Sequence, residues 1–217
     1  MSKTIDYSYL RQQMVEVQLV GRKISDARVI SAFRKVKRHE FVSLQDKDIA
    51  YQDSPLPIGH GQTISQPYIV ALMTECLNLK GSEKVLEIGT GCGYQTAILA
   101  ELVKNVYSIE RIEALTKTAD AVLKKLGYKN VVLETGDGTL GLLENAPYDS
   151  IIVTAACRKI PDAYLGQLKV GGRIVIPLGD RFSQVLTVAK KNDTGIDKHV
   201  VCGCVFVPLI GKDGWDK

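Results

Sequence analysis

The segment with the clearest chemical signature is residues 85–93 (VLEIGTGCG), an apolar run that ends in glycines at alternate positions. Glycines at such a turn let the backbone bend sharply and let a ligand touch the main chain. The dinucleotide fingerprint G-x-G-x-x-G would need a further glycine where this chain has Tyr94 or Thr96. The segment therefore predicts a ligand site, but not one for a nicotinamide dinucleotide.

Two carboxylates follow this segment, each at the end of a further apolar run. Glu110 comes about twenty residues after the glycines, where a carboxylate can accept hydrogen bonds from both hydroxyls of a ribose. Asp137, between Gly136 and Gly138, can accept a hydrogen bond from the amino group of an adenine. Alone, the first is more often a solvated carboxylate and the second a turn. Their order and spacing, one strand apart, favour a nucleoside site.

These residues need a scaffold that brings several strand ends together, and the remaining sequence predicts one. From Lys84 onward, short apolar runs alternate with helical segments, which predicts an α/β fold with a mostly parallel, doubly wound sheet. The last two strands have only a short polar connection and predict an antiparallel finish. The ligand should lie beyond the carboxyl ends of the first strands. The expected strands are 84–88, 105–109, 130–134, 148–155, 172–178, 183–190 and 199–209, and the expected helices are 94–103, one ending at 127, and 160–168.

The residues that precede the sheet predict helices and one long loop. A helix is expected over 9–20, another after Gly21, and a third from Pro67 to Leu77. Residues 51–67 contain three prolines and two glycines, which exclude a continuous helix or a central strand. A loop of this length usually carries function.

The composition predicts a globular protein with 45% hydrophobic and 24% charged residues. The formal net charge of +4 is a mild excess, and the basic residues are scattered, whereas nucleic-acid binding needs a basic stripe. No run approaches the ~18 apolar residues of a membrane helix, and the first nine residues are too polar for a signal peptide. We therefore expect a cytoplasmic protein with neither nucleic acid nor membrane as a partner.

The cysteines and histidines do not form a metal-binding pattern. Five cysteines, an odd number without a framework spacing, predict reduced thiols. Cys202 and Cys204 should point to one face of a strand, and we expect them to pack against the core. The three histidines lie far apart in the sequence, so no metal site is predicted.

The acidic residue followed by G-x-G-x-G resembles the first motif of the class I methyltransferases, which have a Rossmann-like fold and use S-adenosylmethionine. Nearly the whole chain, moreover, resembles the protein-L-isoaspartate O-methyltransferase family. The Thr-Ile-Ser loop and the Val-Pro-Leu tail are more specific to that family than the glycines are. The matching segments are 38–42 (RHEFV), 56–67 (LPIGHGQTISQP), the glycine run, 136–138 (GDG), 147–156 (PYDSIIVTAA), 171–173 (GGR) and 206–209 (FVPL).

The resemblance implies methyl transfer from S-adenosylmethionine to the free α-carboxylate of L-isoaspartyl residues in peptides and proteins. D-aspartyl residues would be weaker substrates, the product S-adenosylhomocysteine would be released, and the reaction would begin the repair of damaged proteins. The resemblance also implies that Ser65 is the active-site residue; from spacing alone, an N-cap for the helix at Pro67 would be favoured. The implied cofactor-binding residues are Gln62, Thr63, Ser65, Glu87, Gly89, Gly91, Gly93, Glu110, Gly136, Asp137 and Gly138.

The chemistry fits a site without a strong base. An α-carboxylate is already ionised near neutral pH, so the protein must supply orientation and exclusion of water. A serine hydroxyl can hold the anion without neutralising it. The tail 205–209 is expected to line the peptide groove, with free main-chain groups limited by Pro208.

We expect one domain over 1–217. Residues 1–80 would be an N-terminal extension that contributes to a substrate lid, and 81–217 would be the Rossmann-like core. Three alternatives remain open on the sequence: a class I methyltransferase with another acceptor, a module that binds without turnover, and a nucleotide-dependent oxidoreductase. Residues 153–156 read VTAA, where amino methylases of nucleic acids usually carry an Asn/Asp-Pro-Pro-Tyr type of motif.

Overall fold

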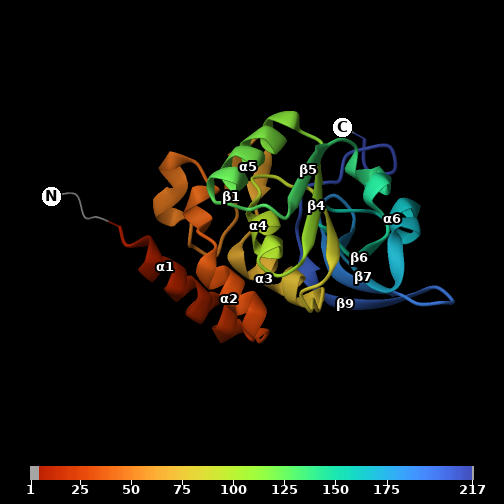
Figure 1. Ribbon diagram of the computed structural model, residues 1–217, viewed down its shortest axis with the longest axis horizontal. Coiled ribbons are helices and arrows are strands. Elements are labelled where there is room, and N and C mark those ends of the chain that lie inside the picture. Colours follow the sequence, from red (N-terminus) through yellow and green to blue (C-terminus); the bar gives the residue numbers. More distant parts are fainter. Residues whose placement is uncertain (1–4, 217) are drawn as a thin grey trace.

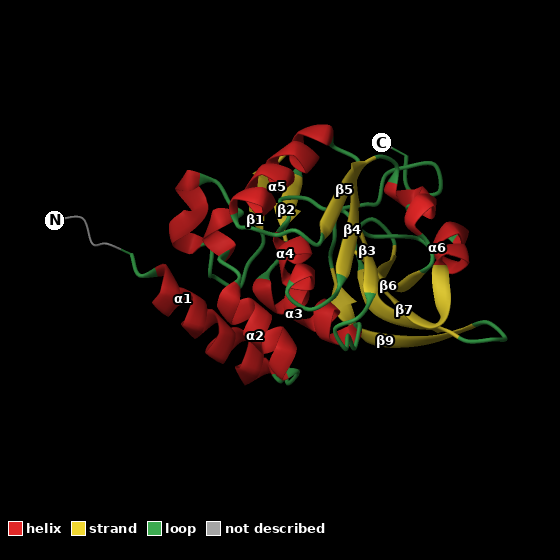
Figure 2. Cartoon of the chain, viewed as in Figure 1, coloured by secondary structure: helices red, strands yellow, loops and turns green. Residues whose placement is uncertain are grey.

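The computed structural model describes residues 5–216. They form a seven-stranded sheet with helices on both faces and a separate two-stranded hairpin (Figures 1 and 2). The predicted fold class, a mostly parallel sheet with an N-terminal helical part and antiparallel C-terminal strands, is confirmed. Within the described residues, no helix is both long enough and apolar enough to span a membrane.

The sheet has the strand order β5-β4-β3-β6-β7-β8-β9. Neighbours from β5 to β7 pair in parallel, whereas β7, β8 and β9 pair antiparallel. The chain moves outward through β3, β4 and β5, and β6 then returns to the other side of β3. A crevice therefore opens beyond the carboxyl ends of β3 and β6. The strands are β3 (Lys84–Ile88), β4 (Asn105–Glu110), β5 (Val131–Thr135), β6 (Tyr148–Val153), β7 (Leu168–Gly179), β8 (Gln184–Lys191) and β9 (Ile196–Cys204).

Side chains alternate between two hydrophobic cores along the central strands. On β3, Val85 belongs to the core beneath the N-terminal helices, α4 and α5, and Leu86 belongs to the opposite core, beneath α6. Both are fully buried, as expected for a parallel strand covered on two sides. The helices are α1 (Tyr7–Gln13), α2 (Ala27–Lys35), α3 (Pro67–Cys76), α4 (Tyr94–Ala100), α5 (Glu113–Lys125) and α6 (Asp162–Gln167).

The first helical segment is longer and less regular than predicted. It begins at Tyr7, where Asp6 caps the free N–H groups of Ser8 and Tyr9, and it continues as a π-helical segment over Met14–Leu19. Met14, Val15 and Leu19 are buried there, so this segment anchors the N-terminal part to the core.

The loop before α3 contains the hairpin of β1 (Leu56–Gly59) and β2 (Gln62–Ile64). The backbone reverses through Gly59, His60 and Gly61, all of which have positive φ. Leu56 and Ile64 are opposite each other in the hairpin and both are buried, which fixes it on the core. The prolines exclude a central strand here but allow a short, separate hairpin.

The C-terminal strand differs from its prediction. β9 ends at Cys204, and the chain then crosses to the end of β6 instead of continuing along the sheet edge to residue 209. The Ala156 N–H donates to the Val207 carbonyl at 2.8 Å, and the Leu209 N–H donates to the Ala156 carbonyl at 2.9 Å. These main-chain groups, which the sequence predicted to be free for a peptide, are used within the protein.

Candidate active site

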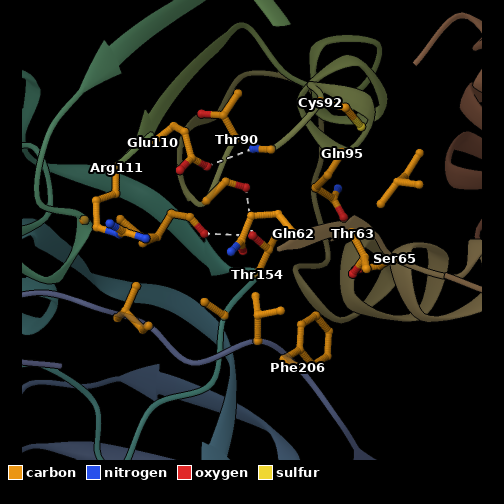
Figure 3. Close-up of a pocket in the computed structure, with 18 of the residues that line it drawn as sticks. Gln62, Thr63, Ser65, Thr90, Cys92, Gln95, Glu110, Arg111, Thr154 and Phe206 are labelled. Carbon is orange, nitrogen blue, oxygen red and sulfur yellow. Dashed lines mark hydrogen bonds between the residues drawn. The ribbon is translucent and has the colours of Figure 1, made fainter. Parts of the chain in front are cut away.

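A pocket lies at the carboxyl ends of β3, β4 and β6, beneath the β1–β2 hairpin (Figure 3). Figure 3 shows Glu110 and Arg111 on one side of this pocket and Thr63 and Ser65 on the opposite side, with Thr154 between them. We call it the inner pocket. Its lining consists of residues 62–65, Val70, Met73, 88–92, Tyr94, Gln95, 109–112, Gly138, Thr154, Ala155 and 206–210.

The glycine turn forms one wall of the inner pocket. Gly89 has φ +97°, and a Cβ there would collide with the Thr154 hydroxyl, so glycine is required. That hydroxyl donates to the carbonyls of Ile88 and Gly89 at 2.9 and 2.8 Å, which ties the turn to the end of β6. The conformation of the glycine turn is therefore fixed by its hydrogen bonds to the residue that follows β6.

Glu110 lies at the end of β4 and is almost completely buried. Its carboxylate accepts hydrogen bonds from the Gly91 N–H at 3.0 Å and from the Ile112 N–H at 2.9 Å. Two main-chain donors fix the direction of the side chain, and Glu110 remains part of the pocket lining. A carboxylate held in this way is suited to accept hydroxyl groups from a ligand.

Glu87 lies behind the pocket and is fully buried. The hydroxyls of Thr96 and Ser108 donate to one carboxyl oxygen at 2.5 and 2.6 Å, while the other oxygen has no partner among the described residues. Burial raises the pKa of Glu87 to about 8, although the two hydroxyls lower it in part. At neutral pH this side chain is mostly a neutral acid that links β3, β4 and α4.

Asp137 lies beside the pocket, and its carboxylate is occupied within the protein. It accepts hydrogen bonds from the Thr139 N–H and hydroxyl and from the Lys212 N–H. Burial raises the pKa of Asp137, but these hydrogen bonds outweigh it and hold the pKa below its usual value. Gly138, the next residue, is in the pocket lining, so Asp137 connects the pocket to the C-terminal tail.

The C-terminal tail is clamped by the side chain of Trp215. Its indole N–H donates to the Ala156 carbonyl at 3.2 Å, and the guanidinium groups of Arg158 and Arg181 lie 3.9 and 5.2 Å from its ring centroid. The tail thus joins the end of β6 to the loop that carries Asp137.

Ser65 is not the N-cap of α3 in the structure. The N-cap residue is Gln66, which makes no side-chain capping hydrogen bond. The Tyr68 N–H donates to the Asp53 carboxylate at 3.4 Å. Ser65 is instead in the lining of the inner pocket.

A second, more open depression adjoins the inner pocket, and we call it the outer groove. Thr63, Ser65, Thr154, Phe206 and Val207 line both cavities. The other lining residues of the outer groove come from the N-terminal part and from β9 with its extension: Arg22, Pro55, Gln66, Tyr68, Ile69, Cys202, Gly203, Cys204 and Val205. Cys202 and Cys204 are thus partly exposed in a groove wall as well as packed against the core.

The structure divides the predicted site residues into two groups. Those in the lining of the inner pocket are Gln62, Thr63, Ser65, Gly89, Gly91, Glu110 and Gly138. Those behind or beside it are Glu87, Gly93, Gly136 and Asp137. Pocket residues that the sequence analysis missed include Gln95, Arg111, Thr154 and Phe206; the matching segments 147–156 and 206–209 were the signal for the last two.

The parallel sheet, the glycine turn after β3 and the carboxylate at the end of β4 define a class I methyltransferase, with the ligand crevice beyond the carboxyl ends of the neighbouring strands β3 and β6. Among residues 5–216, no group of three or more His, Cys, Asp or Glu side chains is placed to hold a metal ion.

Comparison with known proteins identifies the family. The family model of protein-L-isoaspartate(D-aspartate) O-methyltransferase matches residues 10–214, and the chain belongs to this family. Protein-L-isoaspartate O-methyltransferase 1 of Syntrophobacter fumaroxidans is 53% identical over 98% of this chain and 99% of its own length.

Two solved structures are similar to the whole fold. A protein-L-isoaspartate O-methyltransferase is superposable with a TM-score of 0.84 at 29% identity, over 94% of this chain and 66% of the other. A second one, from Plasmodium falciparum and in complex with S-adenosyl-L-homocysteine, gives a TM-score of 0.80 at 25% identity, over 95% and 99% of the two chains. The predicted enzyme class and cofactor are thereby confirmed.

Proposed function

We propose that the inner pocket binds S-adenosylmethionine, that the outer groove binds the peptide, and that the methyl group passes between them at Ser65. The chain is an S-adenosylmethionine-dependent protein-L-isoaspartate O-methyltransferase by family, and this proposal assigns its parts. The observation that carries it is the shared border: Thr63 and Ser65 line both cavities. A methyl donor in one cavity and an acceptor in the other can meet only there.

The residues of the inner pocket fit such a cofactor. Glu110, fixed by two main-chain donors, is suited to accept hydrogen bonds from the ribose hydroxyls. Ile88, Ile109 and Leu209, in the lining near Gly138, offer an apolar slot for the adenine. Gln62 and Thr63 would cover the cofactor from the hairpin. Glu87, Gly93, Gly136 and Asp137 would act by shaping the walls.

When bound, S-adenosylmethionine supplies a methyl group on a positively charged sulfur: an oxygen of the isoaspartyl carboxylate forms the new C–O bond while the C–S bond breaks and its electron pair passes to sulfur. The protein does not need to remove a proton in this step, because the carboxylate is already ionised. Its task is to align the two groups and keep water out.

Ser65 is suited to the alignment. Its hydroxyl is free of the capping role, and it stands at the border of the two cavities. One hydrogen bond from a neutral hydroxyl holds a carboxylate in place with little loss of nucleophilicity, whereas a tightly bound cation would reduce it. Ser65 is thus the catalytic residue of this proposal.

The N-terminal extension contributes the cover of the site. Residues 62–64 of β2 lie over the inner pocket and Leu56 and Ile64 attach the hairpin to the core. We therefore infer that the N-terminal extension, residues 1–80, forms part of a substrate lid within a single domain over 1–217.

The test is methylation of paired peptides that differ only in carrying Asp or isoaspartate at one position, with S-adenosylmethionine labelled on the methyl group. We expect label on the isoaspartyl peptide alone, and release of that label by mild base, because the product is an ester. A D-aspartyl peptide should be labelled more slowly. Label on neither peptide, with intact binding of S-adenosylhomocysteine, would contradict the proposed acceptor.

A further inference from the structure

The outer groove is lined almost entirely by uncharged side chains. Among the described residues that line it, Arg22 is the only one with a charged side chain, and the others are neutral polar or apolar. Arg22 is in the lining of the outer groove and not in that of the inner pocket. Its charge therefore bears on the parts of a bound peptide that flank the methyl acceptor, and not on the acceptor itself.

The guanidinium of Arg22 is held in a defined orientation. Its central carbon lies over the Tyr68 ring, 3.4 Å from the ring centroid. Its Nη1 donates to the Asp53 carboxylate at 2.7 Å. That bond uses one of the five N–H groups of arginine, and 45% of the side chain remains exposed. A fixed planar donor next to a groove is suited to bind a carboxylate.

Asp53, the ion-pair partner of Arg22, is anchored by further donors. Its carboxylate also accepts from the Gln66 side-chain amide at 3.0 Å and from the Tyr68 N–H at 3.4 Å, at the start of α3. Asp53 is outside the groove lining, whereas Arg22 is within it. Arg22, and not Asp53, therefore forms part of the wall that a peptide in the groove would contact.

We propose that Arg22 determines substrate specificity by binding an acidic side chain of the peptide close to the isoaspartyl residue. The inference rests on the proposed function of the outer groove. Isoaspartyl peptides with Asp or Glu at one flanking position are preferred to neutral ones, and those with Lys or Arg at that position are disfavoured. Because Arg22 is partly exposed, the preference is modest, about three- to tenfold in kcat/KM, and weakens as salt increases.

The experiment compares isoaspartyl peptides of one sequence in which Glu, Gln or Lys is placed in turn at each of the three positions before and after the isoaspartate. The wild-type protein should show, at one position or two adjacent ones, the order Glu, Gln, Lys, with the difference mainly in KM. The ratio of Glu to Gln peptides should fall to about one in Arg22→Gln and persist in part in Arg22→Lys.

The ratio is unaffected by any general loss of activity that Arg22→Gln causes through Asp53 and the loop. Arg34→Gln is the matched control, since Arg34 is similarly exposed, forms an ion pair with Glu16 and lies outside the groove. It should keep the wild-type ratio. The inference would be overturned if the wild-type protein showed no charge preference at any of the six positions, or if the ratio of Glu to Gln peptides were unchanged in Arg22→Gln. If the wild-type protein methylated none of the isoaspartyl peptides, the proposed function itself would be overturned.

Discussion

The inner pocket and the outer groove are built in different ways. The inner pocket has one half formed by the residues that follow the parallel strands, and these are fixed by hydrogen bonds such as those of Glu110 and Thr154. The hairpin region and residues 206–210 complete it. The outer groove is formed by the N-terminal hairpin region on one side and by β9 and its extension on the other, two segments far apart in the sequence. Part of the inner pocket is thus encoded locally at the strand ends, while the outer groove depends entirely on the complete fold.

This difference predicts that substitutions separate into two classes. Changes in the inner pocket should reduce cofactor affinity and leave the peptide preference intact. Changes at the border or in the outer groove should alter turnover or peptide affinity, with cofactor binding preserved. Four substitutions test this division, and their expected effects on binding or turnover decrease in order.

Glu110→Ala should have the largest effect. It removes an almost fully buried carboxylate and leaves the N–H groups of Gly91 and Ile112 without acceptors. We expect the Kd for S-adenosylhomocysteine, measured by calorimetry, to rise about 100-fold, as for the loss of a pair of charge-assisted hydrogen bonds. Glu110→Gln has one acceptor oxygen in place of two, so it can accept from only one of these N–H groups, and its Kd should fall between those of the wild-type protein and Glu110→Ala. Glu113→Ala is the control because that side chain is exposed. Unchanged affinity in a folded Glu110→Ala protein would contradict the ribose assignment.

Ser65→Ala should lower kcat about tenfold, the cost of one hydrogen bond to a charged group, while the Kd for S-adenosylhomocysteine changes less than twofold. Single-turnover methylation of an isoaspartyl peptide measures the first and calorimetry the second. Ser65→Thr, which keeps a hydroxyl, should retain more activity. If Ser65→Ala is fully active, Ser65 has no catalytic role.

Trp215→Ala should raise the Kd for S-adenosylhomocysteine several-fold and lower the Tm. The tail then loses the indole hydrogen bond to the Ala156 carbonyl and the contacts with Arg158 and Arg181, although its main-chain hydrogen bonds with Ala156 remain, and the loop at Asp137 loses support. Trp215→Phe keeps an aromatic ring without the N–H and should be milder. A lowered Tm with an unchanged Kd would place the tail outside the cofactor site.

Glu87→Gln should have the smallest effect on binding and a distinct effect on stability. In the folded protein the pKa of Glu87 is raised to about 8, above its ordinary 4.5. Its stabilising contribution is complete below pH 4.5 and is lost as the pH rises toward 8, at about 1.4 kcal/mol per pH unit. Glutamine, which resembles the protonated acid, does not titrate. Urea unfolding from pH 5 to pH 8 should therefore show the wild-type protein losing stability relative to Glu87→Gln. Parallel curves would exclude a raised pKa.

The sequence predicts the inner pocket better than the outer groove, for a physical reason. Residues 85–93 and Glu110 lie at strand ends, and the strands of an alternating β and α sequence can be located from the hydrophobic pattern. Asp137 shows the limit: its partner Thr139 is only two residues away, but its other partner, Lys212, depends on the path of the tail. That path could not be read from the apolar pattern of 199–209, because the chain leaves the sheet within it.

The outer groove is still less accessible to sequence analysis. The hairpin β1–β2 was expected only as a loop, since its prolines mask a two-stranded pairing. Arg22 was not singled out, because it is one of many scattered cations until Tyr68 and Asp53 place it beside the groove. Specificity here is a property of contacts between distant segments.

The border that the two cavities share at Thr63, Ser65, Thr154, Phe206 and Val207 also has a consequence for inhibitor design. Because the two cavities share this wall, a short linker is enough to join a cofactor analogue to an isoaspartyl-like peptide in one molecule. The second half would then bind at a high effective concentration, and such a bisubstrate ligand is expected to exceed the affinity of either half by about 10²–10⁴-fold. The peptide half would carry selectivity against other methyltransferases, since the cofactor half addresses a pocket that they share.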